Sequence, residues 1–253
     1  MLAVKRLEEI TRLLSERGSV DAAWLSNQFG VTAKTIRKDL DQLESMGLLE
    51  RVHGGAVIRS NANNVYPIEQ RKLKYLDEKR RIGMAAFEFV EEGDTLIIDG
   101  GSTTIELARL LGDKKIIAVV DDLRIAVELM NKPAVTLFMP GGKLRREGSY
   151  TFLGRDAERA IEKYKVKKLF LGTSAFDFQA GLSVLNSDEA EVKKAMISVA
   201  QEIICLTDYS KFHHIAFATF CPIDRINTLI TDDRMPESEK DFLSQKGIQV
   251  HTV

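Results

Sequence analysis

A polar, glycine-rich cluster follows one apolar segment of the sequence, and its residue types suit the binding of an anion. The apolar run 95–98 leads directly into Asp99, Gly100, Gly101, Ser102, Thr103 and Thr104. Two glycines allow a backbone to approach a ligand closely, and hydroxyls with free amides at the start of a helix can cradle an anion. The cluster is neither a G-x-G-x-x-G fingerprint nor a P-loop, so it does not indicate a nucleotide site.

Similar clusters of cations, carboxylates and hydroxyls follow other apolar segments. Their members are Gly141, Gly142, Lys143, Arg145, Thr173, Ser174, Asp208 and Lys211. Glu189 and Lys193 stand four residues apart on a predicted helix, which is also the spacing of a solvated surface pair. Taken singly, each cluster is explained as a turn, a cap or a surface charge. Together they supply cations and amides for a phosphate and carboxylates for hydroxyls, which is the mixture that a phosphorylated polyol requires.

These clusters are predicted to lie at strand ends, because strand-like and helical segments alternate from residue 94 onward. The predicted strands are Thr95–Ile98, Ile116–Val120, Val135–Met139, Lys168–Leu171, Ile203–Thr207, Thr228–Thr231 and Ile248–Val253. The predicted helices are Thr103–Leu111, Leu123–Met130, Asp156–Tyr164, Glu189–Ala200 and Glu237–Gln245. This alternation predicts an α/β domain with a mainly parallel sheet, whose ligands bind outside the carboxyl ends of the strands.

The first 60 residues have a different pattern, typical of a winged helix-turn-helix. Apolar residues at helical spacing predict a first helix that Gly18 ends, and a second helix runs from Asp21 to Gly30. Thr32 is a predicted N-cap for a third helix with Ile36, Leu40 and Leu43 on one face. The segment 48–59 predicts two short strands around a glycine turn.

The third helix carries the residue types that contact DNA. Its first turns hold Thr32, Lys34, Thr35, Arg37 and Lys38. Lysine and arginine attract phosphates and contact guanine, and the major groove admits one helix. In the hairpin, His53 lies at the tip with Arg51 and Arg59 nearby, and these residues are predicted to contact an adjacent groove or phosphate. The alternative is a solvated helix face, since residues 1–60 carry only nine Lys and Arg against eight Asp and Glu.

The composition excludes several classes of protein. The 36 Lys and Arg nearly balance the 37 Asp and Glu, which speaks against a polycationic coat for nucleic acid or membranes. Cys205 and Cys221 are too few for a zinc cluster or a disulfide framework, and no metal site or cofactor is expected. No apolar run approaches the about 18 residues of a membrane span. Because Lys5 and Arg6 leave no room for a signal peptide, we expect a soluble, cytoplasmic protein.

Two blocks in the first 60 residues make the N-terminal segment similar to a known family. The run 25–40 contains Thr-Ile-Arg-Lys-Asp-Leu at 35–40, and His-Gly-Gly-Ala follows at 53–56. At this spacing the sequence closely resembles the DeoR family of bacterial transcriptional regulators. The resemblance extends to 99–104, 141–145, 171–173, 189–193 and 208–212, and so covers nearly the whole chain.

The resemblance implies a domain similar to ribose-5-phosphate isomerase that senses a phosphorylated sugar. It implies that Ser102–Thr104 and Lys211 lie near the phosphate, and that Asp99, Glu189 and Asp208 lie toward the sugar. Two positions depart from the family pattern. Where members commonly have Thr-Asn-Ser, this chain has Val120-Asp121-Asp122, and Asp188 stands where an asparagine is frequent. Each change places a carboxylate where the family has an amide, and Asp121 is therefore included in the predicted effector site.

We expect three segments: a winged helix-turn-helix domain over 1–59, a linker over 60–76, and an effector-sensing domain over 77–253. The predicted function is a DNA-binding regulator, a repressor of a sugar or polyol operon that a phosphorylated sugar or polyol releases from double-stranded operator DNA. A homodimer or homotetramer would present two DNA-binding heads. One alternative is an isomerase-type enzyme fused to a DNA-binding head, with Asp99, Glu189 or Asp208 as general base. A purely structural DNA-binding protein would leave the ligand-like strand ends unexplained.

Overall fold

The computed structural model describes residues 5–7, 9–10, 13–14, 19–45, 49–52, 54–58, 74–146 and 149–253 of the 253-residue chain. The chain divides into two compact units, Met1–Leu76 and Asp77–Val253. Most of the predicted linker lies outside the described residues, so the predicted domain limits stay a prediction. No helix among the described residues is both long enough and apolar enough to cross a membrane.

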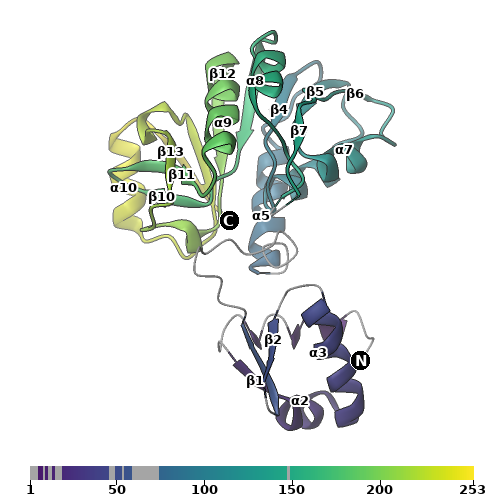
Figure 1. Ribbon diagram of the computed structural model, residues 1–253. Coiled ribbons are helices and arrows are strands. Elements are labelled where there is room, and N and C mark those ends of the chain that lie inside the picture. The colour runs from purple at the N-terminus through teal and green to yellow at the C-terminus, as the bar shows by residue number, and fades with distance from the viewer. Residues whose placement is uncertain are drawn as a thin grey trace. The chain divides into compact units, whose positions relative to one another are not determined.

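The first unit contains the helix-turn-helix and wing that the sequence predicts. Residues 5–7, 9–10 and 13–14 are helical. The further elements are β1 (Ser19–Asp21), α2 (Ala22–Phe29), α3 (Ala33–Ser45), β2 (Leu49–Val52) and β3 (Gly55–Ile58). The hairpin β2–β3 is antiparallel, and β1 adds a third strand beside β3. Figure 1 shows α2, α3 and these strands. The strand β1 was not predicted, because three residues are too few to show an alternating pattern.

Local sequence explains the start and end of the two helices. Asp21 caps α2 by accepting a hydrogen bond from the Trp24 amide at 2.8 Å. Gly30 ends the helix in the left-handed conformation, with φ at +63°. In α3 the apolar stripe Ile36, Leu40 and Leu43 is buried against the rest of this unit, as its spacing predicts.

The second unit is built on a seven-stranded sheet in which every neighbouring pair of strands is parallel. Its strand order is β15-β14-β12-β9-β4-β5-β6. In chain order the strands are β4 (Thr95–Ile98), β5 (Ile116–Val120), β6 (Val135–Phe138), β9 (Val166–Leu171), β12 (Ala200–Leu206), β14 (Thr228–Thr231) and β15 (Gln249–Thr252). The predicted mainly parallel sheet is confirmed, with all seven predicted strands present.

Helices cover both faces of this sheet. On one face lie α5 (Leu76–Phe87), α6 (Thr104–Leu110) and α7 (Leu123–Leu129), whose apolar side chains pack with Leu96 and Ile98 of β4. On the other face lie α8 (Arg155–Ile161), α9 (Ser187–Val199) and α10 (Glu237–Gln245), which pack with Ile97. Successive residues of one strand therefore enter opposite cores, which explains why the strands are apolar throughout. Figure 1 shows this layered arrangement.

Short additional strands were missed by the sequence analysis. A three-stranded antiparallel sheet contains β10 (Ala175–Asp177), β11 (Gly181–Val184) and β13 (Ala218–Cys221). A two-stranded ribbon joins β7 (Lys143–Leu144) to β8 (Phe152–Leu153). Single turns η1 (Tyr209–Lys211) and η2 (Ile223–Arg225) complete the second unit. Strands of two to four residues carry too little periodicity to be recognised in a sequence.

Candidate functional site

The order of strands creates one place in the sheet where polar side chains can converge. From β4 the chain builds outward through β5 and β6, and then returns to the other side of β4 with β9. Ligands of open α/β sheets bind at such a switch point, outside the carboxyl ends of the strands. Asp99 directly follows β4, and Gly172 directly follows β9. The Gly172 amide donates a hydrogen bond to Asp99 Oδ2 at 2.7 Å, so the two strand ends meet here.

A buried ion pair forms the centre of the site. Lys193, on α9, donates from Nζ to Asp99 Oδ2 at 2.5 Å and to the Gly172 carbonyl at 3.2 Å. Both charged side chains are only 1–2% exposed. Burial by itself lowers the pKa of Lys193, but the charges of Asp99 and Glu189 outweigh it and the pKa is raised. The lysine therefore stays charged, and the interpretation of Glu189 and Lys193 as a solvated surface pair is wrong.

Glu189 pairs with a second cation of the same site, Arg145. Its Oε2 lies 2.6 Å from Arg145 Nη1, and its Oε1 lies 3.9 Å from Lys193 Nζ. Asn186 caps α9 by accepting a hydrogen bond from the Glu189 amide at 2.9 Å, which holds the first turn of the helix. Arg145 comes from the segment after β7. This contact joins Arg145 to the Glu189 carboxylate, although the two residues are 44 positions apart in the sequence.

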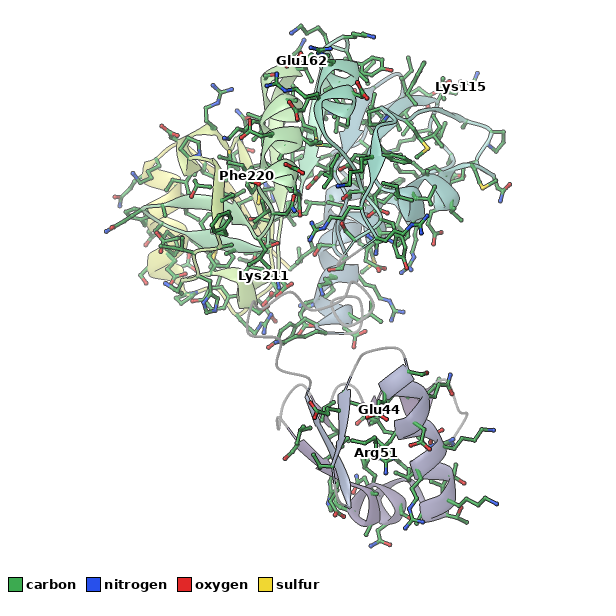
Figure 2. All side chains as sticks on the ribbon, in the orientation of Figure 1. Glu44, Arg51, Lys115, Glu162, Lys211 and Phe220 are labelled. Carbon is green, nitrogen blue, oxygen red and sulfur yellow. The ribbon has the colours of Figure 1, made fainter. Side chains whose placement is uncertain are left out.

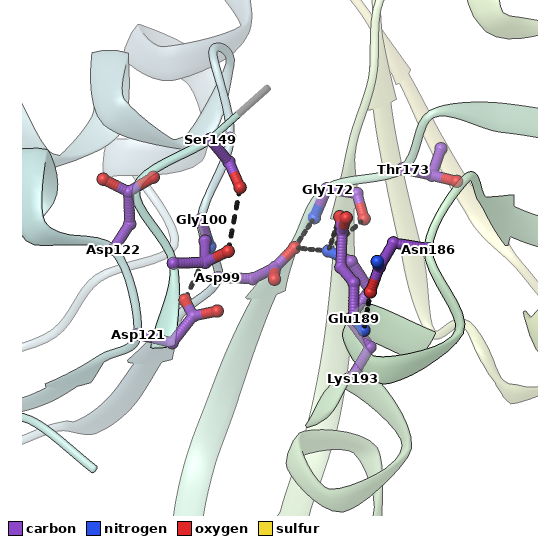
Figure 3. A network of polar contacts seen from close by, with 12 residues as sticks. Asp99, Gly100, Asp121, Asp122, Ser149, Gly172, Thr173, Asn186, Glu189 and Lys193 are labelled. Carbon is purple, nitrogen blue, oxygen red and sulfur yellow. Dashed lines mark hydrogen bonds and ion pairs between the residues drawn. The ribbon is translucent and has the colours of Figure 1, made fainter. Parts of the chain in front are cut away.

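Asp121, which directly follows β5, lies beside this ion pair. Its Oδ1 accepts a hydrogen bond from the Gly100 amide at 2.8 Å. Burial raises the pKa of Asp121 well above its ordinary value, and the charge of Asp99 raises it further. The next residue, Asp122, instead caps α7 and pairs with Arg124. Figure 3 shows Asp99, Gly100, Asp121, Asp122 and the Gly172–Lys193 side of the cluster together.

The glycine after Asp99 is required for packing at this edge. A Cβ atom on Gly100 would lie 2.4 Å from Thr151 Cγ2 and 3.0 Å from Asp122 Cβ. The Thr151 hydroxyl is in turn 2.9 Å from that of Ser149, and both residues are buried. Ser149 and Thr151, just before β8, therefore bring two hydroxyl groups to one side of the cluster.

The hydroxyl residues after Gly101 begin α6. Ser102 and Thr103 are each 8% exposed, and Thr104 is fully buried. Thr104 donates its hydroxyl hydrogen bond to the Gly101 carbonyl at 3.3 Å. The structure thus places these three residues at the carboxyl end of β4, beside Asp99, where the sequence predicts them.

Other predicted site residues are not joined to this cluster. Gly142 and Lys143 are exposed, and Gly141 and Gly142 both have positive φ angles. Thr173 donates its hydroxyl hydrogen to the carbonyl oxygens of Ala175 and Ser183, at 2.7 and 3.1 Å. The Ser174 amide also donates to that Ser183 carbonyl, at 3.3 Å. This accounts for Thr173 and Ser174 as supports of the β10–β11 hairpin, and their contact with an effector stays a prediction.

A second buried charge pair lies at the end of β12. Asp208 is 1% exposed, and its Oδ2 lies 4.0 Å from the Nζ of Lys79 on α5, itself 2% exposed. Asp208 Oδ1 also accepts hydrogen bonds from the Ser210 amide and hydroxyl, which fixes the turn η1 that carries Lys211. Lys211 is half-buried and is labelled in Figure 2.

Among the residues of these networks that were left out of the predicted effector residues, only Lys79 carried a usable signal. Lys79 shares a buried stripe with Ile82, Gly83 and Ala86 on α5, at helical spacing, so the position of a lysine on an apolar face identifies it. Gly172 and Asn186 contribute a backbone amide and a helix cap. Neither role has a pattern that distinguishes it from an ordinary turn residue.

The basic face of the first unit lies where the sequence predicts it. Lys34, Arg37 and Lys38 are exposed on the first two turns of α3. Thr32 caps this helix: its Oγ1 accepts a hydrogen bond from the Thr35 amide at 3.2 Å and lies 2.9 Å from the Thr35 hydroxyl. Cations near a helix N-terminus oppose the helix dipole, each at a cost of about 0.3–1 kcal/mol. Such a local conflict is typical of a functional surface.

The acidic residues of α3 contact Arg6 and Arg51, and within the described part of the chain none forms an ion pair with Lys34, Arg37 or Lys38. Asp39 is buried in an ion pair with Arg6, 2.5 Å from its Nε. Arg51, on the wing, lies 2.5 Å from Asp41, and its amide donates to Glu44 at 2.8 Å. Figure 2 shows Glu44 and Arg51 adjacent. Arg51 therefore braces the wing against α3, and its predicted contact with DNA stays a prediction; His53 and Arg59 lie outside the described residues.

Among the described residues no group of three or more His, Cys, Asp and Glu side chains is arranged to hold a metal ion. Both cysteines are free and fully buried.

Comparisons with known proteins match both units. Residues 6–62 match a model described as the DeoR-like helix-turn-helix domain, and residues 74–233 match the DeoR C terminal sensor domain. The chain is 36% identical over 249 residues to the putative aga operon transcriptional repressor of Escherichia coli O157:H7, covering 97% of this chain and 92% of that protein. It is 34% identical over 251 residues to the HTH-type transcriptional regulator GlpR of Haloferax volcanii, covering 99% and 98%. Among solved structures, ribose 5-phosphate isomerase A of Methanocaldococcus jannaschii aligns with a TM-score of 0.40 and 17% identity over 55% of each chain.

Proposed function

This chain belongs to the DeoR family of transcriptional regulators, and we propose that it represses a sugar or polyol operon and leaves its operator when a phosphorylated sugar or polyol binds. The observation that carries the proposal is the exposed, unneutralised cationic face of α3 in a chain whose other unit buries a carboxylate–lysine cluster at its strand ends. One unit has the charges that bind DNA, and the other has the groups that bind a polyol.

We assign the DNA contacts to the first turns of α3. Lys34, Arg37 and Lys38 meet phosphates and base edges, with Thr32 and Thr35 positioned at the start of the helix. The wing supports α3 through Arg51. Asp39 and Asp41 are paired with arginines from outside α3, and Glu44 accepts a hydrogen bond from a backbone amide, so these acids do not pair with the cations of this face.

We assign the effector site to the carboxyl ends of β4, β5, β9 and β12. Asp99, Glu189 and Asp208 face the hydroxyls, and Ser102–Thr104 with Lys211 take the phosphate. A phosphate dianion gains from charge-assisted hydrogen bonds to cations and hydroxyls. Effector binding shifts the DNA equilibrium only through a difference in affinity between two conformations. We infer that the two conformations differ in the placement of two DNA-binding heads within a homodimer or homotetramer. When the effector is bound, the distance between the heads no longer matches the spacing of the two operator half-sites.

The DNA half is tested by fluorescence anisotropy with duplex DNA that the full chain selects from a random pool. Arg37→Ala weakens binding by about 1–3 kcal/mol, or about 5- to 150-fold. Lys5→Ala is the matched control, since Lys5 is an exposed cation of the same unit but lies on the first helix. Equal losses in the two variants would contradict the assignment to α3.

The sensing half is tested by thermal shift with phosphorylated sugars and polyols. A ligand at about 100 times its Kd stabilises the chain by about 2.7 kcal/mol. Lys211→Ala removes this shift and leaves DNA affinity near that of the parent chain, whereas exposed Lys194→Ala retains the shift. If no compound of this class changes either melting or DNA affinity, the sensing half is wrong.

The isomerase alternative has weaker support. Both oxygens of Glu189 face cations, at 2.6 and 3.9 Å, and Asp99 accepts two hydrogen bonds on Oδ2, so these carboxylates are engaged in binding contacts. Turnover of ribose 5-phosphate by the purified chain would favour the enzyme instead.

A further inference from the structure

Asp121 differs from every other carboxyl group of the site in having no cation of its own. Lys193 pairs with Asp99, as described above. Asp122 pairs with Arg124 at the start of α7, and Glu189 pairs with Arg145, as their distances show. Within the described part of the chain, no ion pair reaches Asp121, although it is only 3% exposed.

One oxygen of Asp121 is also without a hydrogen-bond partner. Its Oδ1 accepts from the Gly100 amide, but no described residue bonds to its Oδ2. Asp99 has the same arrangement, with both of its hydrogen bonds on Oδ2 and none on Oδ1 from the described residues. Figure 3 shows the carboxyl groups of Asp99 and Asp121 as neighbours, and no hydrogen bond joins them directly. Each of these two nearly buried carboxyl groups thus has one oxygen without a hydrogen-bond partner among the described residues.

The charges around Asp121 favour its protonated form. Asp99 faces it from the end of β4 and Asp122 from the start of α7, and both carboxyl groups raise the pKa of Asp121. Burial raises the pKa of Asp99 as well, but the hydrogen bond and charge of Lys193 favour the ionised form of Asp99. Lys193 of α9 is the opposing cation, but it is bonded to Asp99 and reaches Asp121 only through space. Burial and the charge of Asp99 raise the pKa, as in other pairs of adjacent carboxyl groups, where one group keeps its proton. The hydroxyls of Ser149 and Thr151 carry no charge, and Arg145 of the same segment is paired with Glu189.

We propose that Asp121 binds the effector as a protonated carboxyl group, donating a hydrogen bond to a sugar hydroxyl that in turn donates to Asp99. A hydroxyl both donates and accepts, so it fits between a carboxylic acid and a carboxylate. An ammonium group only donates and cannot accept from the acid, and a phosphate oxygen only accepts and is repelled by Asp99. The inference rests on the proposed function and adds to it that the group bound at this position is an uncharged hydroxyl.

The expected signature is an affinity that falls as pH rises. Because the bound hydroxyl accepts a hydrogen bond from protonated Asp121, ligand binding holds the proton on Asp121 more tightly. Above the pKa of Asp121 in the free protein, affinity therefore decreases by up to about tenfold per pH unit. The probes are glucose 6-phosphate, galactose 6-phosphate and fructose 6-phosphate, with glucosamine 6-phosphate as the ammonium analogue. Isothermal titration calorimetry of the full chain is carried out from about pH 6 to about pH 9.

Asp121→Asn separates this role from a structural one. Its amide donates a hydrogen bond at every pH, so the variant binds the probe more tightly than the parent chain at the alkaline end. The dependence of its affinity on pH then reflects only the titration of the phosphate and of groups other than residue 121. Asp188→Asn is the matched control, since Asp188 is exposed on the first turn of α9, and it retains the parent profile. Asp121→Ala loses affinity throughout the pH range because it supplies no donor.

Three results would overturn the inference. The first is a dependence of affinity on pH that is the same in the parent chain and in Asp121→Asn. The second is tighter binding of glucosamine 6-phosphate than of the other sugar phosphates, with an affinity that rises with pH. The third is binding by none of the phosphates at any pH, which removes the proposed sensing function as well. The first two leave sugar-phosphate sensing in place, so failure of the inference is distinguishable from failure of the function.

Discussion

Replacing Lys193 by methionine tests the buried ion pair on which the site depends. The substitution keeps most of the length of the side chain and removes the charge beside Asp99. Breaking a buried pair by removing one partner costs about 3–5 kcal/mol, because the other charge stays buried without compensation. For a unit of this size each kcal/mol corresponds to about 2–4 °C, so we expect the melting temperature of the second unit to fall by about 6–20 °C.

The neighbouring residue offers a matched control. Lys194 pairs with Glu191 at 2.8 Å, and both side chains are about half exposed. Exposed pairs contribute about 0–1 kcal/mol, so Lys194→Met lowers the melting temperature by less than about 4 °C. Differential scanning calorimetry of the full chain resolves this difference.

A double variant identifies the cause of the loss. If the uncompensated charge of Asp99 is responsible, then Lys193→Met combined with Asp99→Asn is more stable than Lys193→Met alone, with a coupling energy of about 0.5–3 kcal/mol. A loss in Lys193→Met no larger than in Lys194→Met, or a strictly additive double variant, would refute the argument from burial.

Further predictions follow from other buried groups. Asp39→Ala removes the hydrogen bonds that Asp39 accepts from Arg6 at 2.5 and 3.0 Å, and urea unfolding should show a loss of about 3–5 kcal/mol in the first unit. Gly100→Ala forces a Cβ into contact with neighbouring side chains and should cost about 1–3 kcal/mol in the same assay, a result that a cost near zero would contradict. Burial raises the pKa of Cys221 to about 12 and that of Cys205 still higher, so neither thiol should react with iodoacetamide at about pH 8 until the chain is unfolded. Rapid labelling of the folded chain would show that these thiols are accessible.

The sequence was sufficient for features that depend on local pattern. Apolar runs of four to seven residues identify the strands of the large sheet, because a strand covered on both faces is apolar throughout. The spacing of Ile36, Leu40 and Leu43 determines which face of α3 is buried and therefore which cations are exposed. The residue types after β4 likewise predict a ligand-binding edge before any strand order is known.

The partners of the charged residues could not be predicted in this way. Asp99 and Lys193 are 94 residues apart, and Arg6 and Asp39 are 33 apart, so no local period relates them. The order of strands brings the end of β9 beside that of β4, and only this adjacency gives Asp99 its lysine and leaves Asp121 without a cation. The sequence alone determined which chemical groups stand at the strand ends, since that follows from residue order. Tertiary structure decided which charges are paired and buried. The paired residues lie on segments that are far apart in the sequence, and only the folded arrangement of strands and helices sets the distances between them.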